Sequence, residues 1–346
     1  MKKVMIGMSG GVDSAVAALL LKNQGYSVTG VTMKLWRYSP DGSDTQIADT
    51  ISDAKAVCDT LGIEHQVLDL EETFKNTVVK NFISEYINGR TPNPCIVCNR
   101  LLKFGVMYDE AMHQGFDYIA TGHYAKVIKD ESGYHLYMSD AKAKDQSYVL
   151  YNFTQETLSK TLMPLGDYTK EEVRRIAEEN NLIVSNKPES MEICFVPNDD
   201  YKSFITDFSG FTPKEGDILD YEGNIIGRHS GVMNYTIGQR KGIGAYGRPM
   251  FIMNINPQKN TITLGEKGME FSSELRAKDV NVISGGLLPK TCYAKVRYQA
   301  MPAEAEISYE GENILVKFTT PQRAITPGQA VVFYDGDEVL GGGTVI

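Results

Sequence analysis

The sequence has no hydrophobic run long enough to span a membrane, which needs about 20 consecutive apolar residues. The apolar stretch behind Lys2 and Lys3 is broken by Gly10, Gly11 and Asp13, and no small-residue cleavage site follows, so we do not interpret it as a signal peptide. Cysteine is also scarce. Five cysteines, an odd number among 346 residues, argue against the disulfide framework of a secreted protein. We therefore expect a cytoplasmic protein that does not contact membranes.

Positive charge is in deficit, since the formal net charge is −9. An acidic chain repels the phosphate backbone of nucleic acids, which excludes indiscriminate binding to DNA or RNA. It still permits a local basic patch that fits one shaped RNA. Internal repeats and low-complexity segments are absent as well, so the length predicts two or three ordinary globular domains.

A glycine-rich loop near the start is the most informative pattern that is present. The β-type run Val4–Ile6 leads into Gly-, Ser- and Asp-containing residues, and an Ala/Leu-rich helical segment follows. Glycines let the backbone approach an anion, and the free amides at a helix start face it. No lysine precedes the Ser/Thr, so this is not a Walker A motif, and chemistry at a different phosphate is indicated. The S-G-G-x-D-S pattern of residues 9–14 resembles the PP-loop of ATP pyrophosphatases, which implies that Asp13 and Ser14 bind Mg²⁺ or the leaving pyrophosphate.

Strands and helices alternate from residue 2 to about residue 200, which predicts a parallel, doubly wound sheet with its site at the carboxyl ends of the strands. The expected strands are Val4–Gly7, Ser27–Thr32, Glu64–Leu68 and Asp117–Thr121, and the expected helices are Ser14–Gln24, Ile47–Leu61, Phe74–Asn88, Leu101–Gln114, Lys170–Asn180 and Asp199–Asp207. The glycine loop follows the first of these strands, where the rule for such sheets requires it.

The pattern changes after Phe211, where helical periodicity gives way to short β-type runs punctuated by Gly, Pro and Asn. We therefore predict an α/β fold with a PP-loop ATP pyrophosphatase domain over residues 1–208. Two small β-rich modules follow, a central one over 209–272 and a C-terminal β-barrel over 273–346.

A C-x-x-C pair, Cys95 and Cys98, comes soon after Pro92 and Pro94. Prolines disfavour a helix before the pair, so we expect it on a loop that leads into a helix from Asn99. The spacing alone leaves a redox dithiol, half of a zinc site, sulfur chemistry or an unreactive pair open. A second C-x-x-C or a histidine pair, which a zinc site would need, is missing.

The remaining cysteines fall into two kinds. Cys58 and Cys292 occupy apolar helical and β-type contexts, so we predict that they are packing residues. Cys194 lies in the segment KPESMEICFVPND, about a hundred residues after the C-x-x-C pair.

Over nearly its whole length the chain resembles the tRNA-specific 2-thiouridylases, which use ATP to place sulfur on C2 of the wobble uridine, position 34, of tRNA. The resemblance rests on nine segments in family order: GMSGGVDS (7–14), VTMKLW (31–36), TPNPCIVCNRLLKFG (91–105), ATGHYAKV (120–127), AKDQSYVLY (143–151), ESMEICFV (189–196), HSGVMNYTIGQRKGIG (229–244), KVRYQ (295–299) and ITPGQAVVFY (325–334).

The resemblance implies which residues bind the substrates. Those implied for ATP are Gly7, Met8, Ser9, Gly10, Gly11, Val12, Asp13, Ser14, Met33 and Gly122. Those implied for the target base and the rest of the tRNA are Asn93, Pro94, Cys95, His123, Lys144, Asp145, Gln146, Arg297, Tyr298 and Gln329. Lysine and arginine suit phosphates, and tyrosine offers a stacking face for an extruded base.

The resemblance also implies a reaction in two stages. The C2 oxygen of uracil is a poor leaving group, so ATP adenylates it and pyrophosphate departs, with Asp13 among the catalytic residues. A persulfide on Cys194 then supplies sulfur, and Cys98 is the second thiol, which frees the sulfur or closes a disulfide with Cys194. Thiolates do this work, so we expect lowered thiol pKa values near Cys98. The implied partners are tRNA and a persulfide-carrying donor protein, the cofactors ATP and Mg²⁺, and the state a monomer.

One departure from the family pattern is Cys95, where many members have aspartate. Cys95, Cys98 and Cys194 together could ligate an iron–sulfur cluster, or Cys95 could simply line the base pocket. Two other functions also stay open at this point. The first is another PP-loop adenylating ligase, which would share the ATP loop but would need neither the thiols nor the RNA-binding barrels. The second is a non-enzymatic RNA-binding module, which would not need the ATP loop.

Overall fold

The computed structural model describes residues 1–36, 38, 45–185, 187 and 193–346. Its first sheet has five parallel strands in the order β3-β2-β1-β4-β7. They are β1 (Lys3–Gly7), β2 (Ser27–Lys34), β3 (Glu64–Asp69), β4 (Tyr118–Ala120) and β7 (Thr161–Leu162). The strand order reverses between β1 and β4, and doubly wound sheets bind ligands outside the carboxyl ends of the strands at this point. The glycine loop leaves β1 there.

Helices cover both faces of this sheet because β1 is apolar on both sides. Val4 and Ile6 pack against α1 (Val12–Asn23), α2 (Thr45–Leu61) and α8 (Lys170–Glu179), whereas Met5 faces the core that contains α6 (Met107–His113). This alternation is the period of two that a strand imposes. The predicted parallel sheet is therefore confirmed.

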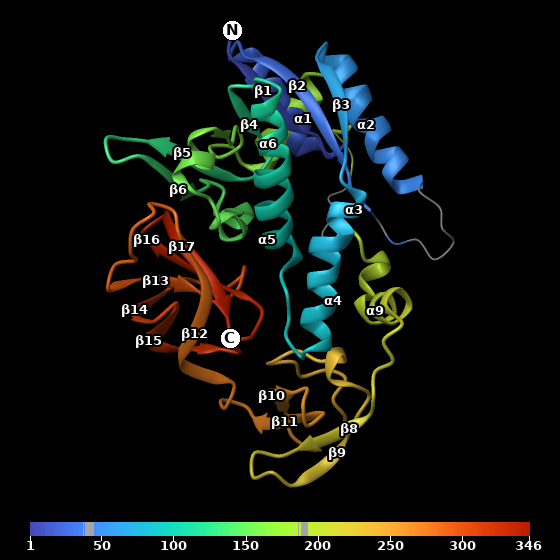
Figure 1. The fold of residues 1–346 in the computed structure, drawn as a ribbon, viewed down its shortest axis with the longest axis vertical. Coiled ribbons are helices and arrows are strands. Elements are labelled where there is room, and N and C mark those ends of the chain that lie inside the picture. Colours follow the sequence, from blue (N-terminus) through green and yellow to red (C-terminus); the bar gives the residue numbers. More distant parts are fainter. Residues whose placement is uncertain (37, 39–44, 186, 188–192) are drawn as a thin grey trace.

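Two long helical stretches descend from the sheet toward the middle module (Figure 1). The first comprises α3 (Glu71–Phe74), the π-helical segment η1 (Lys75–Val79) and α4 (Lys80–Ile87), and the second comprises α5 (Pro94–Cys98), the π-helical segment η2 (Asn99–Val106) and α6. Phe74 and Phe82 of the first stretch pack on the ring of Phe195, at centroid distances of 5.4 and 5.2 Å. This aromatic cluster, which also includes Phe204 of α9 (Tyr201–Ser209), anchors the chain next to Cys194.

The shorter elements are η3 (Lys142–Lys144), η4 (Ser147–Leu150), α7 (Gln155–Ser159), η5 (Pro197–Asp199) and η6 (Val232–Asn234). The middle module is a four-stranded sheet in the order β10-β11-β8-β9. Its strands are β8 (Gly216–Leu219), β9 (Ile225–His229), β10 (Met250–Asn256) and β11 (Thr261–Glu266). Its own core, around Ile252 and Leu264, is fully buried.

The C-terminal module is a closed six-stranded barrel in the order β12-β15-β14-β13-β16-β17, because β12 also pairs with β17. Its strands are β12 (Phe271–Val282), β13 (Thr291–Lys295), β14 (Ala303–Glu310), β15 (Asn313–Arg323), β16 (Ala330–Asp335) and β17 (Glu338–Val345). The predicted fold class, an α/β PP-loop domain followed by two β-rich modules with a final barrel, is confirmed. None of the helices in the described ranges combines the length and the apolar character needed to cross a membrane.

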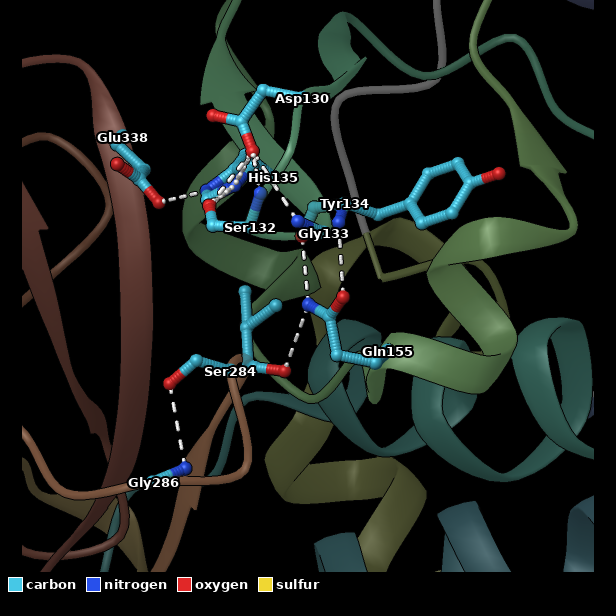
Figure 2. Close-up of polar contacts among 10 residues, drawn as sticks. Asp130, Ser132, Gly133, Tyr134, His135, Gln155, Ser284, Gly286 and Glu338 are labelled. Carbon is cyan, nitrogen blue, oxygen red and sulfur yellow. Dashed lines mark hydrogen bonds and ion pairs between the residues drawn. The ribbon is translucent and has the colours of Figure 1, made fainter.

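A hairpin of the first domain, which the sequence analysis did not predict, joins this barrel. It consists of β5 (Ala125–Lys129) and β6 (Tyr134–Met138), and β6 pairs antiparallel with β17. Figure 2 shows the contact: Gln155 donates to the carbonyls of Tyr134 (2.7 Å) and Ile283 (3.2 Å). His135 lies between Glu338 on the barrel (2.6 Å) and Asp130 on the hairpin (3.1 Å) (Figure 2). The sheet of the barrel thus continues into the first domain.

We expect this contact to weaken as the pH rises above neutrality. The hydrogen bond and the charge of Glu338, with a smaller effect of Asp130, raise the pKa of His135. A group whose pKa is raised by folding stabilises the fold fully below its unfolded pKa, about 6.5, and this stabilisation is lost as the pH rises through the folded value. A partly exposed pair of this kind contributes at most about 1 kcal/mol.

The measurement is the difference in urea unfolding free energy between the wild type and Glu338→Gln, at mildly acidic and mildly alkaline pH. The acidic groups near this imidazole are Asp130 and Glu338, and Asp335 and Tyr137 lie close by. We expect a clear difference under acidic conditions that shrinks under alkaline conditions. A difference that does not change with pH would show that His135 does not carry it.

Candidate active site

The glycine loop between β1 and α1 is folded tightly onto the helix start. The hydroxyl of Ser14 accepts a hydrogen bond from the Ser9 amide (3.2 Å) and donates one to the Gly11 carbonyl (3.1 Å). Gly10 has φ +66°, and a Cβ there would lie 3.0 Å from the carbonyl oxygen of Thr50. Only glycine fits this conformation without strain, which explains why glycine stands at this position of the loop.

Lysines do reach this loop, but from distant parts of the chain. Lys170 on α8 and the Tyr124 hydroxyl both donate to the same carboxylate oxygen of Asp13, each at 2.7 Å. Lys187 donates to the Gly10 carbonyl (3.0 Å) and pairs with Asp53 (2.5 Å). Sequence reasoning missed these residues because no local motif marks them. Two lysines therefore contact the loop region even though the Walker lysine is missing, and each is paired with a carboxylate.

The end of β4 passes directly beside the helix start. A Cβ on Gly122 would lie 2.8 Å from the Ser14 amide nitrogen and 2.9 Å from the Asp13 carbonyl carbon, closer than real Cβ atoms come. Met33, near the end of β2, lines the same space. The three predicted ATP-binding segments, residues 7–14, Met33 and Gly122, are thus brought together.

Gly122→Ala is expected to impair ATP binding strongly, because the methyl group would push β4 away from the loop backbone. We expect a loss of about 1–3 kcal/mol in unfolding free energy as well, the usual effect of overpacking. Isothermal titration with ATP measures the first effect. Gly286→Ala, in an exposed loop of the barrel, is the control for adding a methyl group, because Gly286 does not have a positive φ and the atom nearest to the new Cβ is Ser284 Oγ, at 3.6 Å. Unaltered ATP affinity in a folded Gly122→Ala variant would contradict this placement.

The C-x-x-C pair lies on helix α5, so the prediction of a loop there is wrong. Pro94 is the first helical residue, a position at which its missing N–H costs nothing, and the Asn93 side chain caps the helix by accepting from the Cys95 amide (3.2 Å). Cys98 is buried, whereas Cys95 and Cys194 are exposed. All five cysteines are free thiols, and Cys58 and Cys292 are buried in cores, which confirms their prediction as packing residues.

The expectation of a lowered pKa at Cys98 is also wrong. Burial raises the pKa of the Cys98 thiol, and the positive charge of Lys103 only partly opposes this effect. The reason is positional, because Cys98 ends helix α5 rather than beginning it and so receives no stabilisation from the helix N-terminus.

One cavity of about 420 Å³ joins the glycine loop to the thiols. Its described lining includes the loop residues Gly7, Met8, Ser9, Asp13 and Ser14, then Met33, Pro94, Cys95, Cys98, Gly122, His123, Gln146 and Cys194. Cavities of 300–1,000 Å³ are typical of small-ligand sites. Of the ESMEICFV segment, residues 189–192 lie outside the described part of the chain, whereas Ile193, Cys194 and Phe195 line the cavity.

The barrel supports the mouth of this cavity. Gln329 donates to the carbonyls of Thr91 (2.9 Å) and Pro92 (3.3 Å), and the Thr91 amide donates to Pro327 (2.9 Å). The loop that leads into helix α5 is therefore held by barrel residues. Tyr298 is 40% exposed, and burial together with the charges of Asp145 and Cys95 raises its pKa, so its ring lies near the helix that carries the thiols.

Comparisons with known proteins agree with this geometry. Family models described as tRNA methyl transferase HUP domain, tRNA methyl transferase PRC-barrel domain and Aminomethyltransferase beta-barrel domain match residues 2–198, 202–266 and 272–345. The tRNA-specific 2-thiouridylase MnmA of Clostridioides difficile (strain 630) is 52% identical over 354 residues, which cover 99% of this chain and 98% of that protein. A protein of the same name from Carboxydothermus hydrogenoformans is 47% identical, and the matched region covers 99% of this chain and 97% of that protein. This chain belongs to the tRNA-specific 2-thiouridylase family.

A solved 4-thiouridine synthetase–RNA complex with bound ATP resembles the chain only in part. The TM-score is 0.37 and the identity 17%, over 60% of this chain and 50% of that one, so the resemblance carries no argument here.

The residues that the thiouridylase resemblance implied for tRNA differ in how they are held. Asp145 is buried and accepts from the Ser139 amide (3.0 Å) and the Ser147 hydroxyl (2.7 Å), so an RNA contact through its carboxylate requires these bonds to open. The guanidinium of Arg297 donates to the Arg323 carbonyl.

Two further members of that set lie on either side of Asp145 in the chain. Gln146 accepts from the Tyr124 amide (3.0 Å), and Lys144 ends the short helix η3 and is half-buried. The contacts of all these residues with tRNA stay a prediction.

Proposed function

We propose that the protein places sulfur on C2 of uridine 34 in tRNA, by adenylation of the C2 oxygen followed by transfer of sulfur from a cysteine persulfide. The observation that supports this most directly is the single cavity lined by the glycine loop and by Cys98 and Cys194. An ATP-dependent activation and a thiol reaction on one base need both groups at one site. Family membership supports the same assignment.

In the first stage the uracil C2 oxygen attacks the α-phosphorus of ATP, an O–P bond forms, and the bond to the β-phosphate breaks to release pyrophosphate. The loop amides and the start of α1 bind the phosphates, while Lys170 and Lys187 supply positive charge around the loop. Mg²⁺ fits beside Asp13, since a carboxylate is the ligand type it prefers, and when bound it would neutralise the leaving pyrophosphate.

In the second stage the terminal sulfur of a Cys194 persulfide attacks C2, and AMP leaves with the former C2 oxygen. The Cys98 thiolate then attacks the Cys194 sulfur, the S–S bond to the base breaks, and the thiocarbonyl and a Cys98–Cys194 disulfide result. A reductant restores both thiols. Alternatively, Cys98 attacks the persulfide first and frees sulfide as the nucleophile. The target base must leave the anticodon stack to reach this cavity.

An iron–sulfur cluster is the alternative to this relay, and it would need Cys95, Cys98 and Cys194 as its ligands. Across residues 1–36, 38, 45–185, 187 and 193–346, no three His, Cys, Asp or Glu side chains are arranged so that they could hold a metal ion. Cys95, Cys98 and Cys194 line one cavity, but they do not form such a group. We propose the cysteine relay because it needs nothing beyond ATP, Mg²⁺ and a sulfur donor, with Cys95 lining the base pocket.

The proposal extends to organisation and partners. Residues 1–208 act as the catalytic domain, 209–272 as a central tRNA-binding domain and 273–346 as the barrel that grips the tRNA near the cavity. A separate persulfide-carrying protein charges Cys194, and the protein works as a monomer in the cytoplasm.

The test is a single-turnover reconstitution with purified protein, an unmodified tRNA transcript that carries uridine 34, ATP, Mg²⁺ and polysulfide, whose sulfane sulfur can charge Cys194 as a persulfide. Mass spectrometry of the digested tRNA should detect 2-thiouridine only when ATP is present. The matched control is the same tRNA with cytidine at position 34. Thiolation without ATP, or none at uridine 34, would contradict the proposal.

A further inference from the structure

Lys103 lies in the cavity, yet neither the family resemblance nor the proposed chemistry assigns it a role. Among the described residues that line the cavity it is the only lysine or arginine. It is half-buried, and within the described part of the chain no acidic side chain forms an ion pair with it. Most of the lining around it is apolar. A cation held in such surroundings without a counter-charge is costly unless an anion binds there.

The ammonium group is held by a neutral imidazole. His123 is buried, and burial lowers its pKa well below the ordinary value, so the ring carries no charge. Lys103 Nζ lies 3.4 Å from His123 Nε2, and the Thr121 hydroxyl lies 2.7 Å from His123 Nδ1. An ammonium can only donate, so Nε2 accepts and Nδ1–H donates to Thr121. This chain of hydrogen bonds fixes the direction of the Lys103 side chain.

The helix around Lys103 is wound to turn it into the cavity. In a regular α-helix, a residue five positions after Cys98 would point about 140° away from it. Residues Asn99–Val106 are instead π-helical, and i→i+5 hydrogen bonding brings such residues toward the same side. Gly105 permits this winding, since a Cβ there would lie 3.0 Å from the Arg100 carbonyl oxygen. Lys103 and Cys98 consequently line the same cavity.

Lys103 also lies close to the glycine loop. Its partner His123 directly follows Gly122, whose backbone touches the start of α1 at Asp13 and Ser14. Lys103 therefore lines the same cavity as the groups proposed to bind the ATP phosphates, and its positive charge acts on the thiol of Cys98. The α-phosphate must lie in this region, because it is the atom group joined to the target base in the first stage.

We propose that Lys103 is a catalytic residue that binds the α-phosphate oxygens and stabilises their negative charge during adenylation and again when AMP leaves. The inference rests on the proposed function. Lys103 transfers no proton and forms no covalent bond. In the first step the C2 oxygen bonds to the α-phosphorus as pyrophosphate leaves. In the later step the C2–O bond breaks and its electron pair goes to the departing AMP. In both steps Lys103 stabilises the negative charge on the α-phosphate oxygens. His123 is the positioning residue for Lys103.

The test measures tRNA-dependent pyrophosphate release by Lys103→Gln in the full protein, with Lys103→Arg to restore the charge. Lys55→Gln is the control, since Lys55 is exposed on α2 and pairs with Asp59. We expect kcat of Lys103→Gln to fall about 100-fold or more, as for loss of one oxyanion-stabilising donor, with the KM for ATP changed less than about threefold. Lys103→Arg should recover at least part of kcat. If the melting temperature of Lys103→Gln is lower than that of the wild type, Lys103→Met is used in its place.

Several outcomes would overturn the inference: kcat of Lys103→Gln within about fivefold of the wild type, a pure rise in KM, or equal losses in the Gln and Arg variants. For the positioning role, His123→Gln keeps an acceptor for Lys103 and should retain more of kcat than His123→Leu. Equal losses in these two would remove that role. A wild-type protein that releases no pyrophosphate with tRNA would instead contradict the proposed function, so the two failures are distinguishable.

Discussion

Replacing Cys194 with serine is expected to abolish thiolation of tRNA while tRNA-dependent pyrophosphate release continues at close to the wild-type single-turnover rate. The relay needs Cys194 to carry sulfur, and serine cannot form a persulfide. Adenylation, in contrast, uses the glycine loop at the other end of the cavity. Quantification of 2-thiouridine and of pyrophosphate in the same reaction separates the two stages. Cys292→Ala, which removes a thiol buried in the barrel core, is the control for losing a cysteine.

Cys98→Ser should give a different defect. If the persulfide sulfur attacks C2 directly, the variant lacks the thiol that breaks the resulting disulfide, so tRNA should accumulate as an adduct on Cys194 that a reductant releases. Such an adduct is visible on a non-reducing gel, and Cys98→Ser combined with Cys194→Ser should not form it. If neither adduct nor loss of thiolation follows from Cys98→Ser, the second-thiol role is wrong.

Cys95 separates the relay from a cluster. The relay needs only Cys98 and Cys194, so Cys95→Asp should keep thiolation, because aspartate is the commoner family residue. A cluster would lose a ligand, since a carboxylate is a poorer ligand for cluster iron than a thiolate. Stoichiometric iron and sulfide in protein purified without air, together with thiolation that depends on them, would overturn the relay.

Asp13→Asn is expected to reduce pyrophosphate release about 100-fold or more, because the substitution removes the charge that we assign to the metal–pyrophosphate complex. The amide keeps the shape of the side chain and an oxygen that can accept from Tyr124 and Lys170. Asp13→Ala is a poorer test than Asp13→Asn. Alanine removes the carboxylate that accepts from the buried Lys170, so it is also expected to lower the free energy of unfolding by about 1–3 kcal/mol.

The control for Asp13→Asn is Asp59→Asn, which breaks the exposed ion pair with Lys55 on α2. Thermal melting of Asp13→Asn should stay within a few degrees of the wild type, so that the kinetic defect is not a folding defect. Adenylation at the wild-type rate in Asp13→Asn would show that the metal and pyrophosphate are bound elsewhere.

The features that the sequence predicted correctly are local ones. The alternation of apolar strands with helices and the glycine loop after the first strand can be read within windows of a dozen residues, and both were confirmed. The barrel strands were equally marked by turns and alternation. Family resemblance then brought together Met33, Gly122 and the thiols, which line one cavity in the structure.

The features that were missed depend on distant contacts or on helix geometry. The hairpin β5–β6 has a local signal, β-type residues around the turn D-E-S-G, but its pairing with β17 joins residues about 200 positions apart. Lys170 reaches Asp13 from 157 positions away. Pro94 was interpreted as a helix breaker although it begins α5. Lys103 faces the cavity only because its helix is π-wound, which no sequence period revealed.

The most direct test of the account follows the oxygen that leaves C2. A tRNA carrying ¹⁸O at C2 of uridine 34 is incubated with the protein, ATP, Mg²⁺ and polysulfide as the sulfane-sulfur donor, and the AMP is analysed by mass spectrometry. Adenylation of the C2 oxygen predicts one ¹⁸O in the AMP for every 2-thiouridine formed, and none when the label is at C4. AMP without ¹⁸O, alongside normal thiolation, would contradict adenylation of the base as the activating step.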